Sequence, residues 1–409
     1  MTTAPVPAVP HASQAVFALL CGAWLVWSAM LTAPEALSEL RFSTLGGLPL
    51  PSRVSLLVGG LFSIAFGGLY LGRWLPSRYY TVSLGVHAGG LILSLLIWAS
   101  AGRRLEVMGI LTQSLRLATP IALGALAGIL CERCGVINIA IEGMMLGAAC
   151  IGFAAALYAQ HVWVGLLAAV LAGSLLAGLH AVLAIHGRID QIISGTAINM
   201  LAIGGTGWFR RLFLLHNPRT APAVLPLWPI PLVSDVPVLG QIFFRHQPLV
   251  YVMGLLVIAV HILLFTTRWG LRTRAVGEHP RAADTVGIRV FTVRYVNVLV
   301  SGMLAGLAGA WFSLETVGGF EDLMTGGKGF IALAAMIFGR WNPLGAFGGA
   351  LIFGFTDALQ IKLQIAGVNL PYQFLGMTPY VATMVVLARR TGRGQPPAAA
   401  GVPYEPHAA

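Results

Sequence analysis

Amides, hydroxyls and one carboxylate stand out because they interrupt stretches that are otherwise apolar. Asn138 and Glu142 lie four residues apart in GVINIAIEGMML, over residues 135–146, and therefore share one face of a helix. Gln191 and Ser194 share a face in a second stretch, with Asn199 on a neighbouring face. Such groups can hydrogen-bond to the hydroxyls and base edges of a polar, uncharged solute. We therefore predict that these five side chains line a solute pathway.

Both clusters also have a structural interpretation. A carboxylate inside a membrane is costly and faces the bundle interior or a water-filled cavity. Glu142 could pair with an arginine or cap a half-helix, and we favour a structural role for it. The amides and hydroxyls around Ser194 could instead form hydrogen bonds between helices, as Ser, Thr and Asn commonly do in membranes. For that second cluster both interpretations stay open.

The composition is that of a membrane protein. Of 409 residues, 57% are hydrophobic and 10% are charged, whereas a soluble domain carries about 25% charged residues. Apolar runs of about 20 residues, long enough to span a bilayer as helices, recur along the chain. We predict an all-α polytopic membrane protein with about 10–12 transmembrane helices. The runs lie near residues 15–31, 54–72, 81–101, 112–131, 139–159, 162–186, 191–209, 248–267, 295–314, 328–339, 343–365 and 373–388.

The positive charge orients the helices. The net charge is +11, but the arginines lie at span ends and in short loops, which argues against nucleic acid as a partner. The densest basic cluster is the loop over residues 268–294, so we predict that this loop and both termini are cytoplasmic. The N-terminus lacks the positive start of a signal peptide, so the first run should remain a span. The stretch RRLEVMGILTQSL, from Arg103, is predicted to lie as an amphipathic helix on the outer surface.

Two segments resemble interrupted helices rather than full spans. They cover residues 135–146 and 327–338, the first after an inward-going span and the second after an outward-going one. This is the pattern of an inverted repeat whose broken helices meet near the midplane of the bilayer. The residues shared at equal offsets are Gly135/Gly327, Ile139/Ile331, Ala140/Ala332 and Met144/Met336.

We predict three parts along the chain. Residues 1–80 form an N-terminal extension with two extra helices, and residues 81–390 form the permease core. Residues 391–409, rich in Pro, Ala and Gly, form a disordered cytoplasmic tail.

The sequence contains no recognisable motif for phosphate binding, metal binding or catalysis. The sequence has no phosphate-binding G-x-x-x-x-G-K-[ST] motif and no H-E-x-x-H helix. Cys131 and Cys134 form a lone C-x-x-C without a second pair nearby, so we predict packing residues and no metal site. The histidines are scattered, and no nucleophile lies beside a base in the sequence. We predict that the chain is no enzyme and binds no cofactor of its own.

Taken together, the motifs resemble those of ABC-importer permeases for nucleosides and simple sugars, in the group that includes the branched-chain amino acid permeases. The resemblance covers roughly residues 105–390, and Cys134 departs from it by standing where a serine is expected. It rests on ERCGVINIAIEGMM over residues 132–145, QIISGTAIN over 191–199, GEHPRAADTVGI over 277–288, GFIALAAMIFGRWNPL over 329–344 and PYQF over 371–374. Phe330, in the fourth of these motifs, joins the predicted pathway.

The resemblance implies an assembly. Its members would be an ABC ATPase with two nucleotide-binding domains, which binds the ATP, a second homologous permease and an extracytoplasmic substrate-binding lipoprotein. The expected location is the inner membrane of a bacterial cell. Residues 277–288 would be the coupling helix that docks on the ATPase, with small residues for close packing and charged residues for polar contacts. The coupling residues so implied are Gly277, Glu278, Arg281, Ala282, Ala283, Asp284 and Gly287.

The predicted function is ATP-driven uptake of nucleosides or related small polar solutes, with simple sugars next. The alternative is an ion-coupled secondary transporter, which would need intramembrane carboxylates as relay groups. Glu142 and Asp357 are the candidates for that role, and they are far apart in the sequence.

Overall fold

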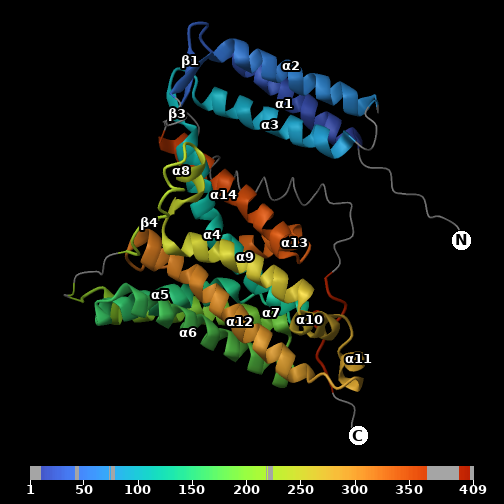
Figure 1. Ribbon diagram of the computed structural model, residues 1–409, viewed down its shortest axis with the longest axis vertical. Coiled ribbons are helices and arrows are strands. Elements are labelled where there is room, and N and C mark those ends of the chain that lie inside the picture. Colours follow the sequence, from blue (N-terminus) through green and yellow to red (C-terminus); the bar gives the residue numbers. More distant parts are fainter. Residues whose placement is uncertain are drawn as a thin grey trace, which may run out of the picture. The chain divides into compact units, whose positions relative to one another are not determined.

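A computed structural model describes residues 11–41, 46–72, 74, 79–217, 219, 224–365 and 396–405 (Figure 1). The predicted last span over residues 373–388, the PYQF motif and the arginines between 389 and 393 lie outside these described residues.

Helices make up most of the described chain. Among the described residues, ten helices are long and apolar enough to cross a membrane, which confirms the prediction of an all-α polytopic membrane protein. The helices are α1 His11–Leu31, α2 Ser52–Leu71, α3 Tyr80–Ala99, α4 Val107–Arg133, α5 Ile141–Ala159, α6 Val162–Ala181, α7 Gln191–Phe209, α8 Leu239–Phe243, α9 Pro248–Thr266, α10 Arg268–Glu278, α11 Pro280–Thr285, α12 Val290–Ala310, α13 Lys328–Phe338 and α14 Pro343–Ile365. Three helices continue as π-helical turns: α6 into η2 Val182–His186, α7 into η3 Arg210–Leu214 and α12 into η4 Trp311–Val317.

The few strands are short. They are β1 Leu37–Arg41, β2 Gly47–Pro51, β3 Arg104–Glu106, β4 Trp228–Pro229 and β5 Arg245–His246. β1 pairs antiparallel with β2 and parallel with β3, and β4 pairs antiparallel with β5. The prediction of a separate amphipathic helix from Arg103 is therefore wrong. Residues 104–106 join a sheet, and the apolar sequence from Val107 runs unbroken into α4, with Pro120 accommodated inside that helix.

Contacts divide the chain into two units. The first comprises Met1–Leu111, Val236–Gln241 and Leu359–Gly376, and the second comprises Thr112–Asp235, Ile242–Ala358 and Met377–Ala409. The first unit groups α3 with α1 and α2, whereas the sequence predicted an extension of two helices that ends at residue 80. A buried polar contact helps to join these helices: the Ser63 hydroxyl donates to the Ala18 carbonyl at 2.8 Å and lies 2.9 Å from Nε2 of His87.

In the second unit, α5 is the central helix, and it contacts α6, α7, α12 and α13 (Figure 1). α6 and α12 cross closely because small residues line both helices. A Cβ added to Gly302 would lie 2.4 Å from Cβ of Ala177 and 2.5 Å from the carbonyl oxygen of Gly173. A Cβ on Gly306, one turn later, would lie 2.5 Å from the carbonyl oxygen of Ala169. This G-x-x-x-G spacing is the usual way for two membrane helices to bring their backbones together.

We expect Gly302→Ala to destabilise the second unit. The new methyl group would force two backbones apart, and overpacking of this kind costs about 1–3 kcal/mol. Thermal unfolding of the purified protein in detergent, followed by intrinsic fluorescence, would measure the loss. The neighbouring Met303→Ala, which alters a side chain that is 38% exposed, is the control. Equal melting temperatures for the two variants would contradict the packing argument.

Part of the tail is ordered, contrary to the predicted disorder of residues 391–409. In the second unit, the described residues 396–405 pack so that Ala399 and Tyr404 are buried. Composition indicated disorder because Pro and Gly interrupt both helices and strands, and the segment has few large apolar side chains. The order comes instead from hydrogen bonds to other elements, which composition does not report.

Candidate functional site

The chain is interrupted between the end of α4 and the start of α5. Gly135 adopts a left-handed conformation with φ of +88°. It ends the helix together with the Val136 amide, which donates to the Cys131 carbonyl at 3.1 Å. Residues 134–140 then form turns and irregular structure between α4 and α5. Backbone groups at membrane depth need partners, because lipid offers none.

Amide side chains of α7 supply these partners. Oε1 of Gln191 accepts from the Ile137 amide at 2.6 Å. Nδ2 of Asn199 donates to the Ile139 carbonyl at 3.0 Å, and its Oδ1 accepts from the Gly143 amide at 2.7 Å. Both amide side chains are buried. The polar cluster of α7 therefore holds the interruption in place.

His180 on α6 completes this arrangement, and sequence analysis did not single it out. Its Nε2 lies 2.9 Å from the Ile137 carbonyl, and its Nδ1 lies 3.1 Å from the Ser194 hydroxyl. Because a carbonyl can only accept, Nε2 carries the proton, and in the neutral ring Nδ1 accepts from Ser194. The only sign of His180 in the sequence is that a polar residue lies inside an apolar run. That sign does not identify Ser194 or Ile137 as its partners.

Asn138 turns the chain into α5. Its side chain is fully buried, and Oδ1 accepts from the Ala140 amide at 3.1 Å. Nδ2 donates to the Ser301 hydroxyl of α12 at 3.2 Å. Asn138 therefore joins the end of the interruption to α12.

Glu142, the second residue of α5, joins the two interrupted segments. Its Oε1 accepts from the Thr325 hydroxyl at 2.6 Å and from the Gly327 amide at 2.9 Å, and its Oε2 accepts from the Gly329 amide at 2.6 Å. Gly327 is the N-cap of α13, so the carboxylate lies at the positive end of that helix. A Cβ on Gly329 would lie 2.6 Å from Cα of Glu142, so only glycine fits there. The start of α5 and the start of α13, which belong to the two segments predicted to form an inverted repeat, are therefore in contact.

A second carboxylate acts on the same turn of α13. Lys328, its first residue, forms an ion pair with Asp357 of α14, which is only 6% exposed. Glu142 and Asp357, separated widely in sequence, therefore converge on the start of one short helix. Together they neutralise the positive helix end and the lysine beside it.

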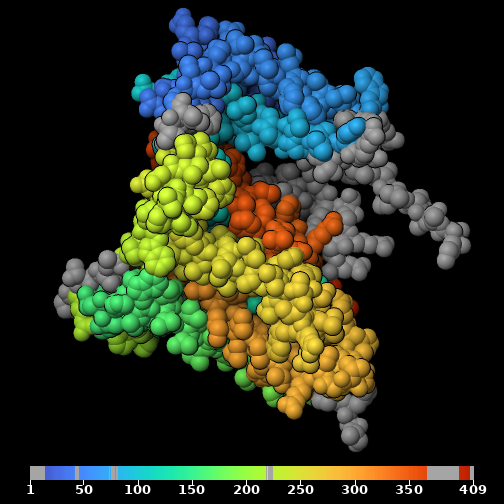
Figure 2. Space-filling model, viewed as in Figure 1, coloured from blue at the N-terminus to red at the C-terminus, as the bar shows by residue number. Residues whose placement is uncertain are grey.

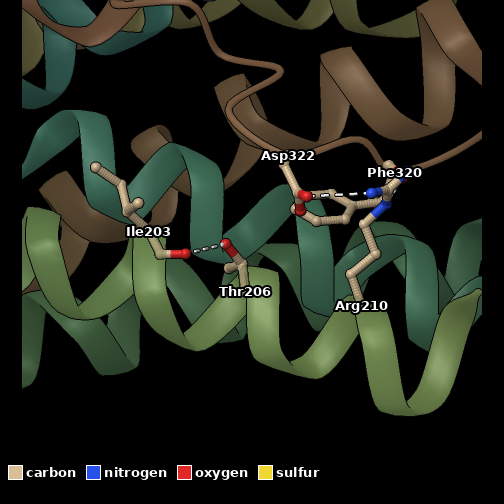
Figure 3. Close-up of polar contacts among 5 residues, drawn as sticks. All are labelled: Ile203, Thr206, Arg210, Phe320 and Asp322. Carbon is tan, nitrogen blue, oxygen red and sulfur yellow. Dashed lines mark hydrogen bonds and ion pairs between the residues drawn. The ribbon is translucent and has the colours of Figure 1, made fainter.

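Arg210, the first residue of η3 after α7, also holds the loop that leads into α13. Nε of Arg210 donates to the Phe320 carbonyl at 3.2 Å, and its guanidinium pairs with Asp322 at 3.1 Å (Figure 3). One turn earlier, the Thr206 hydroxyl bonds back to the Ile203 carbonyl at 3.4 Å (Figure 3). From the sequence, such arginines indicated only the orientation of the membrane helices, so the contact of Arg210 with Asp322 was missed.

The predicted pathway residues differ in exposure. Asn138, Glu142, Gln191, Ser194 and Asn199 are all buried and hydrogen-bonded to protein groups. Phe330 on α13 is 49% exposed. Ile337, seven residues later on the same face of the helix, is 40% exposed. The buried five place and shape the interrupted helices, and Phe330 is available for contact with another molecule.

The segment implied to couple to an ATPase forms a short helical element. α10 ends at Glu278, and Nδ1 of His279 accepts from the Ala282 amide at 3.2 Å to start α11. Yellow to orange atoms of this region form an exposed corner at the lower right of the space-filling view (Figure 2). Most of the implied coupling residues are exposed, namely Glu278, Arg281, Ala282, Asp284 and Gly287.

The other two coupling residues face inward. Ala283 is 4% exposed, so it packs on its own chain, unlike its neighbour Ala282. A Cβ on Gly277 would lie 2.2 Å from the carbonyl oxygen of Arg133, the last residue of α4. The end of α10 therefore rests directly against the point where α4 stops.

The cysteine pair at this point is packed. Cys134 donates its thiol to the Cys131 carbonyl at 3.0 Å, and both cysteines are fully buried. Among the described residues, no group of three His, Cys, Asp or Glu side chains could hold a metal ion.

Comparisons with known proteins agree on one family. The family model described as "Branched-chain amino acid transport system / permease component" matches residues 110–388. The guanosine ABC transporter permease protein NupQ of Bacillus subtilis is 42% identical over 301 residues, which is 70% of this chain and 93% of that protein. The nucleoside ABC transporter permease protein NupC of Lactococcus lactis is 40% identical over 303 residues, with the same two shares.

A third relative is named for a different substrate. The putative glucose ABC transporter permease protein TsgC13 of Haloferax volcanii is 34% identical over 303 residues, 68% of this chain and 91% of that protein. No solved structure is matched.

Proposed function

The chain belongs to the family of branched-chain amino acid transport permease components, and from that premise we propose that it takes up nucleosides or related small polar solutes. It is a multi-pass membrane subunit of an ABC transporter and not itself an enzyme. The choice of solute rests on sequence similarity: the chain is 42% identical to a permease named for guanosine and 40% identical to one named for nucleosides. The more distant glucose relative makes simple sugars the second candidate.

Family membership sets the ion-coupled alternative aside. The two carboxylates that it required, Glu142 and Asp357, are both engaged with the start of α13. Work must then come from a partner ATPase, and we propose one with two nucleotide-binding domains. A second homologous permease and an extracytoplasmic lipoprotein would complete the assembly in a bacterial inner membrane. The basic segment around α10 supports cytoplasmic termini and a cytoplasmic ATPase.

A continuous series of contacts leads from the exposed segment into the membrane. The segment over residues 277–288 would dock on the ATPase, and Gly277 passes its movement to the end of α4 at Arg133. The interruption and α5 follow directly in the chain, and Glu142 connects α5 to α13. On α13, Phe330 offers an exposed aromatic ring on which a base can stack.

Uptake by the reconstituted complex tests the choice of solute. Proteoliposomes holding this chain, its partner permease, the ATPase and the binding protein should accumulate labelled guanosine when ATP is supplied. Unlabelled adenosine should compete, and leucine should not. Accumulation of labelled glucose without any of guanosine would overturn the nucleoside assignment while leaving the family intact.

Charge reversal tests the docking segment. We expect Glu278→Lys with Asp284→Lys to reduce solute-stimulated ATP hydrolysis about tenfold or more, since every 1.4 kcal/mol of lost interaction is a factor of ten. Both side chains are exposed, so the fold should tolerate the change. The matched control is Asp235→Lys with Glu321→Lys, which reverses two exposed charges outside the segment. Undiminished stimulation in the first variant would count against docking through this segment.

A further inference from the structure

Residues 396–405, here called the tail strap, return to the coupling segment after the last described helix. The Ala399 amide donates to the Gly277 carbonyl at 2.9 Å, and the Ala398 amide donates to Oε2 of Glu278 at 3.2 Å. Figure 1 shows this short red segment beside α10 and α11. The strap therefore binds the end of α10 at the backbone of Gly277 and at the side chain of Glu278.

The strap also contacts the interruption before α5. The Gly401 amide donates to the Gly135 carbonyl at 3.2 Å. A Cβ on Gly135 would lie 3.1 Å from the Ala399 carbonyl oxygen, so the two segments approach too closely for most side chains. Gly401 itself has φ of +78°, a conformation that favours glycine.

A buried arginine on α12 holds the strap from a third side. Arg294 is 1% exposed, and both of its Nη atoms lie 3.4 Å from the Val402 carbonyl oxygen. Its Nε has no partner among the described residues. A buried guanidinium needs acceptors, and among the described residues the carbonyl of Val402 in the strap accepts from Arg294.

The end of the strap is fixed by two side chains. The ring of Tyr404 packs edge-on against Phe291 with centroids 5.5 Å apart, and Tyr404 is 4% exposed. Burial and the neighbouring carboxylate of Asp284 raise the pKa of Tyr404 to about 12. Glu405 pairs with Arg188, after η2, at 2.7 Å.

We propose that the tail strap is a mechanical link that binds the coupling segment to the interruption before α5 and to α12, so that these elements move together when the ATPase closes. This inference rests on the proposed role of residues 277–288. Without the strap, α10 and α11 would keep the contact of Gly277 with Arg133 and the covalent connections to α9 and α12. These contacts reach only the end of α4, so less of the movement of the segment would pass to the interruption and the start of α5.

Truncation after Gln395 tests the link. In the reconstituted complex we expect ATP hydrolysis to continue and the ATPase to remain bound in a pull-down. Guanosine accumulated per ATP hydrolysed should fall at least about fivefold. Truncation after Glu405, which keeps the strap, is the control. A truncated complex that couples as well as the full chain would overturn the proposal.

A point variant covers the case in which the truncated chain does not assemble. Gly401→Val keeps the length of the tail but strains a left-handed position and places a Cβ 3.0 Å from Ile137. It should lower the ratio of uptake to hydrolysis in the same direction, about twofold or more. Loss of ATPase binding in both variants would overturn the link in favour of a docking role. Absence of ATP-dependent uptake by the full-length complex would instead refute the proposed function, so the two failures are distinguishable.

Discussion

Glu142→Ala should destabilise the protein more than any other single substitution at the interrupted helices. It strips partners from the Thr325 hydroxyl and from the amides of Gly327 and Gly329. Each buried donor left without a partner costs about 1–3 kcal/mol, so we expect a loss of at least about 3 kcal/mol. ATP-dependent uptake should be lost as well, because the start of α13 would no longer be held. Thermal unfolding and solute uptake measure the two effects.

A graded series separates this role from a general effect of mutation. Glu142→Gln keeps a side chain of the same size but has one accepting oxygen in place of two, so its loss should be intermediate. Thr325→Val removes one donor together with its need for a partner, so its loss should be smallest. Equal stability for Glu142→Ala and Thr325→Val would show that the carboxylate does not hold the helix.

Asn199→Ala should have the next largest effect, and a local one. The Gly143 amide and the Ile139 carbonyl would both lose their partner, at a cost of about 2 kcal/mol or more. Hydrogen exchange followed by mass spectrometry should show faster exchange over residues 137–143. Asn217→Ala removes a partly exposed asparagine beyond the other end of the same helix, away from residues 137–143, and is the control. Unchanged exchange in Asn199→Ala would mean that other groups hold the interruption.

Local sequence predicted the local structure well. The apolar runs over 343–365 and 248–267 correspond to α14 and α9 within a residue, because a lipid-facing helix needs a continuous apolar stretch of that length. The interruption near Asn138 was visible from glycine and polar residues inside such a stretch. A helix of eleven residues at 328–338 was likewise indicated by a run too short to span.

Contacts between distant segments were not predictable in the same way. The Thr325 hydroxyl and Glu142 are 183 residues apart, and neither residue type specifies the other. Ser, Asn and His form hydrogen bonds with any nearby backbone, so the bracing role of Asn199 and His180 depended on the packing of α6 and α7. The tail strap was missed for the same reason, since its order derives from Gly135, Gly277 and Arg294 rather than from its own composition.

The N-terminal segment of the first unit lies outside the family match. That match begins at residue 110, close to the end of this segment at Leu111. The two nucleoside permease relatives are covered over 93% of their length by 70% of this chain. Helices α1 to α3 are therefore an addition to a core that is otherwise nearly complete, and the contact of Ser63 with His87 belongs to that addition.

The carboxylate shared between α5 and α13 limits how the transport cycle can proceed. If the starts of these helices part, a carboxylate and two backbone donors are left without partners in the protein interior, which is costly unless something replaces the lost bonds. Water or the hydroxyl of an arriving sugar ring are the available substitutes. We therefore expect the starts of α5 and α13 to separate only when such a substitute is present to accept or donate the lost hydrogen bonds.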